Sequence, residues 1–177
     1  MTVTRGGMVV DWRLPEDFRI HTARLDLIPA RQEHLNTESQ SRTELSRLLN
    51  ARVAEHWPPE IVPDRDSDGT GWWDWYVVTR DSPSVLIGVC GIKGWPSVSQ
   101  SVQTGCAFLE EFQGQGYGKE AVDGLVSWVL QQPGVERVLA EVSIGNAAAI
   151  GILRRLGFDE LDLDAPAQLL RFAKNKK

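Results

Sequence analysis

The stretch EEFQGQGYGKEA, residues 110–121, is the part of the sequence best suited to holding a ligand. Gly114, Gly116 and Gly118 alternate with other residues, and an apolar-periodic run typical of a helix follows. Glycines leave backbone N–H groups accessible and permit backbone angles that other residues rarely adopt. The first turn of a helix adds a partial positive charge, which favours phosphate oxygens. The stretch therefore predicts an anion-binding loop at the start of a helix.

Two common phosphate-binding loops fit this stretch poorly. A nucleoside-triphosphate loop needs G-x-x-x-x-G-K-[ST], whereas three residues separate Gly114 from Gly118, and Glu120 stands where the Mg²⁺-binding hydroxyl belongs. A dinucleotide loop needs G-x-G-x-x-G after the first strand of a βαβ unit, but Lys119 occupies the place of the third glycine. The motif also follows strands that we expect to be antiparallel. These mismatches argue against both nucleotide ligands.

Glu141 is the second candidate for chemistry, because it lies in the otherwise apolar run RVLAEVSI. A carboxylate there could take a proton from a substrate, or it could face solvent or pair with an arginine such as Arg137. No Ser/His/Asp or Cys/His constellation is evident. The histidines of the N-terminal third are expected to be structural or at the surface: His21, His34 and His56.

The elements that must position these residues change in kind along the chain. The first part predicts strands at 24–30, 73–80, 84–94 and 101–109 and loops at 62–71 and 94–101. It also predicts one or two helices over residues 31–37 and 42–56, ended by the prolines of WPPE. The second part predicts alternating elements, with helices at 117–132 and 146–157 and strands at 137–144, 158–164 and 168–174. This order predicts an α+β fold with one mixed sheet and helices on it. We expect a single domain, with residues 1–17 and 174–177 loosely ordered.

Composition limits the classes of function. The 177 residues carry a net charge of −5, which is a poor basis for binding nucleic acid. No apolar run approaches the ~20 residues that a membrane helix needs, and no secretory signal is evident. Cys90 and Cys106 show no metal-ligand spacing, so we expect two reduced thiols buried in the core and a cytoplasmic protein without a metal. Six of the seven tryptophans precede the glycine loop. Five of these fit either core packing or an aromatic pocket, namely Trp57, Trp72, Trp73, Trp75 and Trp95.

The glycine loop and its context resemble a known family. Gln113, Gly116 and Gly118 spell Q-x-x-G-x-G, which resembles motif A of the GNAT acyltransferases. The run NAAAIGILRRLGF is similar to a second signature of that family, in which an asparagine opens a helix that ends in a Gly-Phe pair. The stretches TARLDLIPA, HWPPE and GWWDWYVV…LIGVCGIKG look like the RimJ/RimL-type branch. The resemblance covers about residues 18–172. It implies a mixed, mostly antiparallel, splayed sheet of six or seven strands flanked by helices.

The resemblance also implies the cofactor and its contacts. Acetyl-CoA would be the acetyl donor, and Asn146 would hydrogen-bond its pantetheine arm, although Asn146 could also be a plain helix cap. The end of the strand would pair with the pantetheine amides like an added strand, through Cys106, Ala107, Phe108 and Leu109. Both the residues and the resemblance place the pyrophosphate on the N–H groups of the loop, which are those of Gln113, Gly114, Gln115, Gly116, Tyr117, Gly118 and Lys119.

The reaction implied is direct transfer of the acetyl group to an amine in a ternary complex. An amine with a pKa near ~10 arrives protonated, so a base is needed, and relatives carry a glutamate at the place of Glu141. Gln103 stands where many relatives have glutamate, and it could orient water or the amine. A backbone N–H near Phe108 or Leu109 would face the thioester oxygen. Many relatives have an acidic tyrosine where this chain has Leu153, so the thiolate must leave without it.

The acceptor and the assembly stay open at this stage. The acceptor would be the N-terminal amine of a protein or peptide, or a small amine, and the acidic balance favours a cationic one. Gln103 and Leu153 also motivate an alternative, in which the chain is a non-catalytic module that senses acyl-CoA. We expect no nucleic-acid or membrane partner, and either a monomer or a homodimer.

Overall fold

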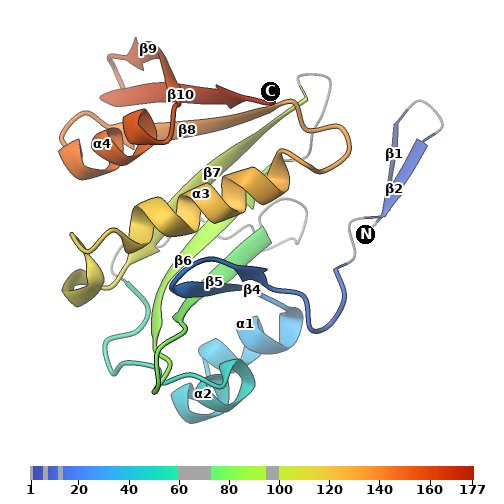
Figure 1. The fold of residues 1–177 in the computed structure, drawn as a ribbon, viewed down its shortest axis with the longest axis vertical. Coiled ribbons are helices and arrows are strands. Elements are labelled where there is room, and N and C mark those ends of the chain that lie inside the picture. Colours follow the sequence, from blue (N-terminus) through green and yellow to red (C-terminus); the bar gives the residue numbers. More distant parts are fainter. Residues whose placement is uncertain (1, 6–7, 12–13, 60–72, 95–99) are drawn as a thin grey trace.

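The computed structural model of the chain describes residues 2–5, 8–11, 14–59, 73–94 and 100–177. One open sheet forms its centre, and helices cover both faces (Figure 1). The strands of this sheet are β3 (Ile20–His21), β4 (Leu25–Pro29), β5 (Trp73–Thr79), β6 (Leu86–Lys93), β7 (Ser101–Phe108), β8 (Arg137–Ser143), β9 (Asp159–Asp164) and β10 (Leu169–Asn175). Two further strands pair with each other, β1 (Thr2–Arg5) and β2 (Met8–Asp11). The helices are α1 (Gln32–Glu38), α2 (Arg42–Leu49), the 3-10 helix η1 (Glu110–Phe112), α3 (Tyr117–Val129) and α4 (Ala147–Arg155).

The main sheet has the strand order β3-β4-β5-β6-β7-β8-β10-β9. Its neighbours pair antiparallel except β7 and β8, which are parallel and are connected through α3. A parallel pair needs such a crossover, because the chain must return to the starting edge. The α+β class with a mostly antiparallel sheet is therefore confirmed. The sheet has eight strands where six or seven were expected, because the two-residue strand β3 is too short to give a sequence pattern.

Each face of the sheet has its own core, and the alternation of side chains along the strands divides the two. In β5, Trp75 and Val77 face the core beneath α3 and α4, whereas Tyr76 and Val78 face the core beneath α2. Trp57 and Trp75 are buried in these cores, so for this pair packing is the correct interpretation. Trp72, Trp95 and the loop expected at 62–71 lie outside the described residues, as does most of the loop expected at 94–101.

Helix α2 ends at Leu49, seven residues before the end that the sequence predicts. Asn50 follows in the left-handed conformation with φ 50°, and its N–H donates to the carbonyls of Ser46 and Arg47. Asparagine is one of the few residues that adopt this conformation at a helix end. The helix therefore stops at an asparagine cap, well before the prolines that were expected to end it.

No helix in the described part of the chain is long and apolar enough to cross a membrane.

Candidate active site

The glycine loop lies between η1 and α3 and presents backbone donors beyond Gln113, whose own N–H already donates to the Glu110 carbonyl at 3.0 Å. Gly114 and Gly116 have φ of 72° and 84°, which residues with a side chain rarely adopt. Gly116 is the N-cap of α3, but it has no side chain that could accept from the free N–H groups of the helix. The first hydrogen bond of the helix runs from the N–H of Glu120 to the Gly116 carbonyl. The N–H groups of the first helical residues, Tyr117 to Lys119, have no acceptor within the helix. The loop and the helix end together offer an anion several converging donors.

Two glutamine side chains of this loop hydrogen-bond to the elements before it, β7 and η1. The amide of Gln113 donates to the Phe108 carbonyl at 3.0 Å, and the amide of Gln115 donates to the Glu111 carbonyl at 2.7 Å. Gly118 lies where α3 and α4 approach, since a Cβ there would be 3.4 Å from Cδ1 of Ile152. The residues that the sequence assigned to the loop are thus brought together at the start of α3.

A gap opens between β7 and β8 beside this loop. The two strands pair through three residue pairs, from Ser101 with Arg137 to Gln103 with Leu139. Beyond Gln103 the strands part, although β7 continues to Phe108 and β8 to Ser143. Figure 1 shows them diverging toward the side where α3 begins and where α4 lies. The sheet is therefore splayed, as expected, at the end nearest the glycine loop.

The hydrogen-bonding phase of β7 determines which peptide groups face this gap. The N–H of Leu109 donates to the Ile87 carbonyl of β6 at 2.9 Å, and the register places Phe108 opposite Gly88. Because antiparallel bonding alternates, the peptide groups of Ala107 and Leu109 point to β6 and those of Cys106 and Phe108 point to the gap. Of the two N–H groups expected near the thioester, that of Leu109 is therefore already bonded, and that of Phe108 faces the gap.

Glu141 and Gln103 lie next to each other on the face of the sheet away from α3 and α4, and the exposed part of this face around Glu141 is here called the open face. The Gln103 amide donates to Oε2 of Glu141 at 3.3 Å, and Nε of Arg171 donates to Oε1 at 3.2 Å. Val138 and Ala140 point to the core under α3 and α4, so Glu141 lies on the opposite face. The two residues predicted for catalysis are thus within hydrogen-bonding distance.

The arginine beside Glu141 is Arg171 of β10, which the sequence analysis missed. It lies directly opposite Glu141 in the strand register and also contacts Asp162 at 3.4 Å and Asp164 at 2.9 Å. Arg137, the partner suggested by proximity in sequence, instead donates to the side chain of Asn175. Only the pairing of β8 with β10 brings Arg171 to this place, so no local signal could have found it.

Comparison with known proteins gives the family. Residues 24–159 match the family described as the acetyltransferase (GNAT) domain, which is more than half of the chain. The chain belongs to the GNAT acetyltransferase family. It is accordingly an acetyl-CoA-dependent acyltransferase, as the glycine-loop motif predicted. A search of curated protein sequences finds no match.

Solved structures of other GNAT proteins share the fold. RimL, a ribosomal L7/L12 alpha-N-protein acetyltransferase solved in complex with coenzyme A, superposes with a TM-score of 0.66 at 16% identity, over 89% of this chain and 98% of that chain. The ribosomal-protein-S5-alanine acetyltransferase of Vibrio fischeri has a TM-score of 0.64 at 14% identity, over 91% of this chain and 98% of that one. A GNAT acetyltransferase of Bacillus anthracis has a TM-score of 0.61 at 13% identity, over 90% and 99%. These neighbours confirm the RimJ/RimL resemblance at the level of the fold.

Within this GNAT fold, Cys106 corrects one expectation. Cys90 is buried as predicted, but Cys106 is exposed, because β8 has left β7 at that point. The two cysteines are opposite each other in the register of β6 and β7. Desolvation by the protein around the gap still raises the pKa of the Cys106 thiol to about 11. The thiol is therefore protonated near neutral pH and is a poor nucleophile.

The remaining candidate residues have clear structural partners. Asn146 is the N-cap of α4, where its side-chain oxygen accepts from the N–H of Ala149 at 3.0 Å, which leaves the amide NH₂ for a ligand. Leu153 is buried in the core and offers no proton. His34 is buried, His21 lies 2.7 Å from Asp26, and His56 lies 3.0 Å from Glu111.

No cluster of metal-ligating side chains occurs within the described ranges.

Proposed function

We propose that this GNAT acetyltransferase moves the acetyl group of acetyl-CoA directly to the N-terminal amine of a protein or peptide, in a ternary complex. One observation carries the proposal: β7 and β8 part beside the glycine loop, and Glu141 and Gln103 lie on the open face of the sheet at this junction. A thioester lying in the gap can then be reached by an amine from the open face. RimL, which shares the fold, is an alpha-N-protein acetyltransferase, and this supports a protein amine over a small one.

The backbone of the chain would hold the donor. The N–H groups at the start of α3 would bind the pyrophosphate of acetyl-CoA. The N–H and carbonyl of Cys106, which point to the gap, would pair with the pantetheine amides in the manner of an added strand. The N–H of Phe108 would stabilise the negative charge that develops on the thioester oxygen. The amide NH₂ of Asn146 would donate to the pantetheine arm, while its oxygen caps α4.

Glu141 would bind the ammonium group of the acceptor and take its proton, directly or through a water. A carboxylate has about four lone-pair sites, so contacts with Gln103 and Arg171 leave sites for an amine. The neutral nitrogen then forms the C–N bond, and the C–S bond breaks. Because Leu153 has no acidic proton, the coenzyme A thiolate would take its proton from solvent. A thiol with a pKa near ~8.5 needs little help to leave at neutral pH.

An acetylation screen resolved by mass spectrometry tests the acceptor. Peptides with a free N-terminus should gain 1 acetyl group, and the same peptides with a blocked N-terminus and a free lysine should gain none. Polyamines, aminoglycosides and free amino acids form the comparison set. If wild-type protein binds acetyl-CoA and acetylates no amine in this panel, the chain is a binding module and the proposal is wrong.

The variant Glu141→Gln tests the base. Loss of a general base lowers rates by roughly 10²–10⁴-fold, so we expect a kcat reduced by about 10²-fold or more with an unchanged Kd for acetyl-CoA. Asp162→Asn is the matched control, because Asp162 is a second carboxylate on Arg171 but belongs to the edge strand β9. Equal kcat values for Glu141→Gln and Asp162→Asn would contradict the assignment of Glu141.

A further inference from the structure

The outer side of the glycine loop is held by Arg24, which is distant from the loop in the sequence. Arg24, at the start of β4, places its guanidinium 4.3 Å from the ring centre of Tyr117. Its Nη1 donates to the carbonyl of Gln115 at 3.2 Å, and a Cβ at Gly116 would lie 3.4 Å from its Nη2. One side chain therefore contacts Gln115 and Tyr117 and passes close to Gly116 between them.

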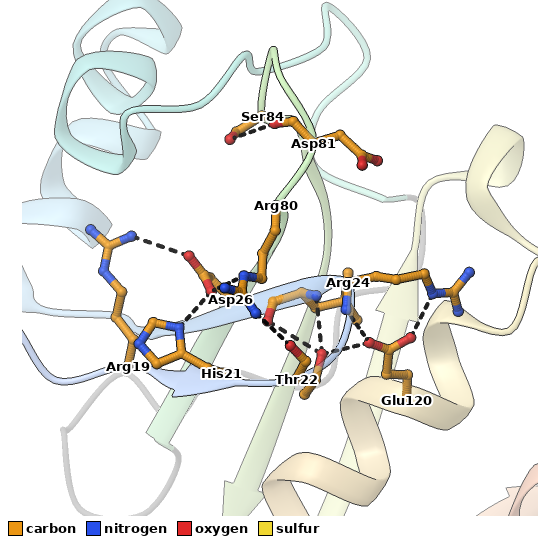
Figure 2. A network of polar contacts seen from close by, with 10 residues as sticks. Arg19, His21, Thr22, Arg24, Asp26, Arg80, Asp81, Ser84 and Glu120 are labelled. Carbon is orange, nitrogen blue, oxygen red and sulfur yellow. Dashed lines mark hydrogen bonds and ion pairs between the residues drawn. The ribbon is translucent and has the colours of Figure 1, made fainter.

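Arg24 is itself fixed in place by Glu120 of α3 (Figure 2). The Glu120 carboxylate accepts from Nε of Arg24 at 2.7 Å, from the Arg24 backbone N–H at 2.7 Å and from the Thr22 hydroxyl at 2.6 Å. Burial raises the pKa of the Glu120 carboxyl, but these hydrogen bonds outweigh it and hold the pKa below its usual value. Thr22, Arg24 and Glu120, here called the Arg24 clasp, thus join β4 and α3 through an ionised, largely covered carboxylate.

The clasp has further support behind it, on the side away from the loop. Oγ1 of Thr22 accepts from the N–H of Leu25 at 3.0 Å, and its carbonyl accepts from Nη1 of Arg80 at 2.8 Å. Asp26 lies 3.6 Å from Arg80 and 3.7 Å from Arg19. The clasp is therefore joined through Arg80 to the polar contacts around Asp26 of β4, which Figure 2 shows.

A glycine loop needs such support because its glycines have no side chains with which to hold it. Glycine has more conformational freedom than any other residue, so ordering a loop of this kind on binding costs free energy. A loop that is already held in its binding conformation does not incur this cost when the ligand arrives. The contacts of Arg24 fall on the residues next to the positive-φ position Gly116, where the loop enters α3.

We propose that Arg24 is a positioning residue for the coenzyme A site, which acts through the glycine loop without contacting the ligand. Held by Glu120 and Thr22, it keeps residues 115–117 in the conformation in which the N–H groups at the start of α3 converge on the pyrophosphate. Nε and Nη1 of Arg24 already have acceptors within the protein, so these atoms are not available to a phosphate. The inference rests on the role proposed above for the loop.

The affinity for acetyl-CoA, measured without an amine acceptor, tests the positioning role of Arg24. In calorimetry, Arg24→Ala should bind acetyl-CoA roughly tenfold more weakly than wild type, since ordering of one or two residues costs about that much. In turnover, KM for acetyl-CoA should rise while kcat stays near that of wild type. With S-acetylpantetheine, which has no pyrophosphate, kcat/KM should be the same for the variant and for wild type. Amide hydrogen exchange at residues 113–119 should be faster in Arg24→Ala.

A second variant separates positioning from direct contact with phosphate. Glu120→Gln removes the group that orients Arg24 but leaves the arginine charge, so positioning predicts weaker acetyl-CoA binding in this variant too. Arg24→Lys should also bind weakly, because a lysine cannot make the three contacts at once. If Glu120→Gln binds acetyl-CoA as tightly as wild type while Arg24→Ala does not, Arg24 contacts the phosphate directly and the proposal is overturned.

Arg19→Ala is the control, because Arg19 belongs to the same polar network and contacts Asp26. It should bind acetyl-CoA with the affinity of wild type. A wild-type protein that binds no coenzyme A would overturn the proposed function and this inference together. A wild type that binds, with an Arg24→Ala variant of equal affinity and equal exchange, would overturn this inference alone.

Discussion

Two titratable side chains, those of His34 and Cys106, owe their protonation state to their surroundings in the fold. Both have a pKa moved by desolvation toward the neutral form. Glu141 differs from them, because it lies on the open face among polar partners, where an acceptor can reach it. His34 is thus enclosed by protein, Cys106 is exposed at the gap but still desolvated by the protein around it, and the group proposed for catalysis is open to solvent.

His34 should make the stability of the protein depend on pH. Burial lowers the pKa of its imidazole below 6.5, and its Nδ1 accepts from the N–H of Arg31 at 3.0 Å. The unfolded chain therefore binds a proton more readily than the folded one as pH falls below 6.5, so the free energy of unfolding should decrease there. Urea unfolding at several pH values should show a shallower decrease for His34→Gln. Identical slopes for both proteins would contradict this role.

Cys106 should report on occupancy of the gap. We expect iodoacetamide to modify the exposed Cys106 and to spare the buried Cys90. The reaction should be slow at neutral pH and should accelerate as pH rises toward the thiol pKa of about 11. Acetyl-CoA should protect Cys106, because the pantetheine arm would lie along β7. Peptide mapping by mass spectrometry measures this, with Cys106→Ser as the control, and labelling that ignores acetyl-CoA would contradict the assigned gap.

At the scale of elements, the residue that caps α4, Asn146, is also part of the proposed donor site. Asn146 caps the helix through its side-chain oxygen, and its amide NH₂ is the group proposed to bind pantetheine. Serine is also a good N-cap, whereas alanine is not. Substitutions at this position can therefore separate the two roles.

The expected result is that Asn146→Ala lowers the free energy of unfolding by about 1 kcal/mol and Asn146→Ser changes it little. Both variants should raise KM for acetyl-CoA, because both lose the amide donor. Chemical denaturation and steady-state kinetics on the same preparations provide the measurement. A normal KM in Asn146→Ser would mean that Asn146 serves only as a cap.

The local sequence pattern predicted most of the helices and strands, but it could not predict contacts between residues that are distant in the sequence. Helices α3 and α4 begin where the sequence indicated, since the signals at Gly116 and Asn146 are local. The end of α2 was missed because the conformation of a single asparagine decides it. The partner of Glu141 depends on strand register, and the contact of Arg24 with Glu120 spans 96 positions. Neither is encoded in neighbouring residues.

At the scale of the whole molecule, the main sheet consists of two groups of strands that meet at β7 and β8. The strands from β3 to β7 lie on one side and β8, β10 and β9 on the other, and three residue pairs join them. The proposed donor site uses both sides, because the loop and β7 belong to the first and Asn146 to the second. A bound donor should therefore hold the two groups together.

Acetyl-CoA should accordingly stabilise the folded chain. A ligand at a concentration of 100 Kd adds about 2.7 kcal/mol, which corresponds to a rise in Tm of roughly 5–10 °C for a chain of this size. ATP and NAD should leave Tm unchanged, because the spacing of the glycine loop suits neither. Scanning calorimetry with each ligand at equal concentration is the measurement. Stabilisation by ATP or NAD equal to that by acetyl-CoA would argue for a general phosphate site.

Peptide groups along β7 point alternately to β6 and to the gap, so the donor site depends on the number of residues in this strand. The bond from Leu109 to Ile87 sets which residues of this strand face β6 and which face the gap. Exchanging one side chain for another leaves that assignment intact, whereas adding or removing a single residue between Gln103 and Phe108 reverses it. Substitutions along β7 therefore leave the backbone part of the donor site unchanged, whereas a length change in this short segment preserves it only in steps of two residues.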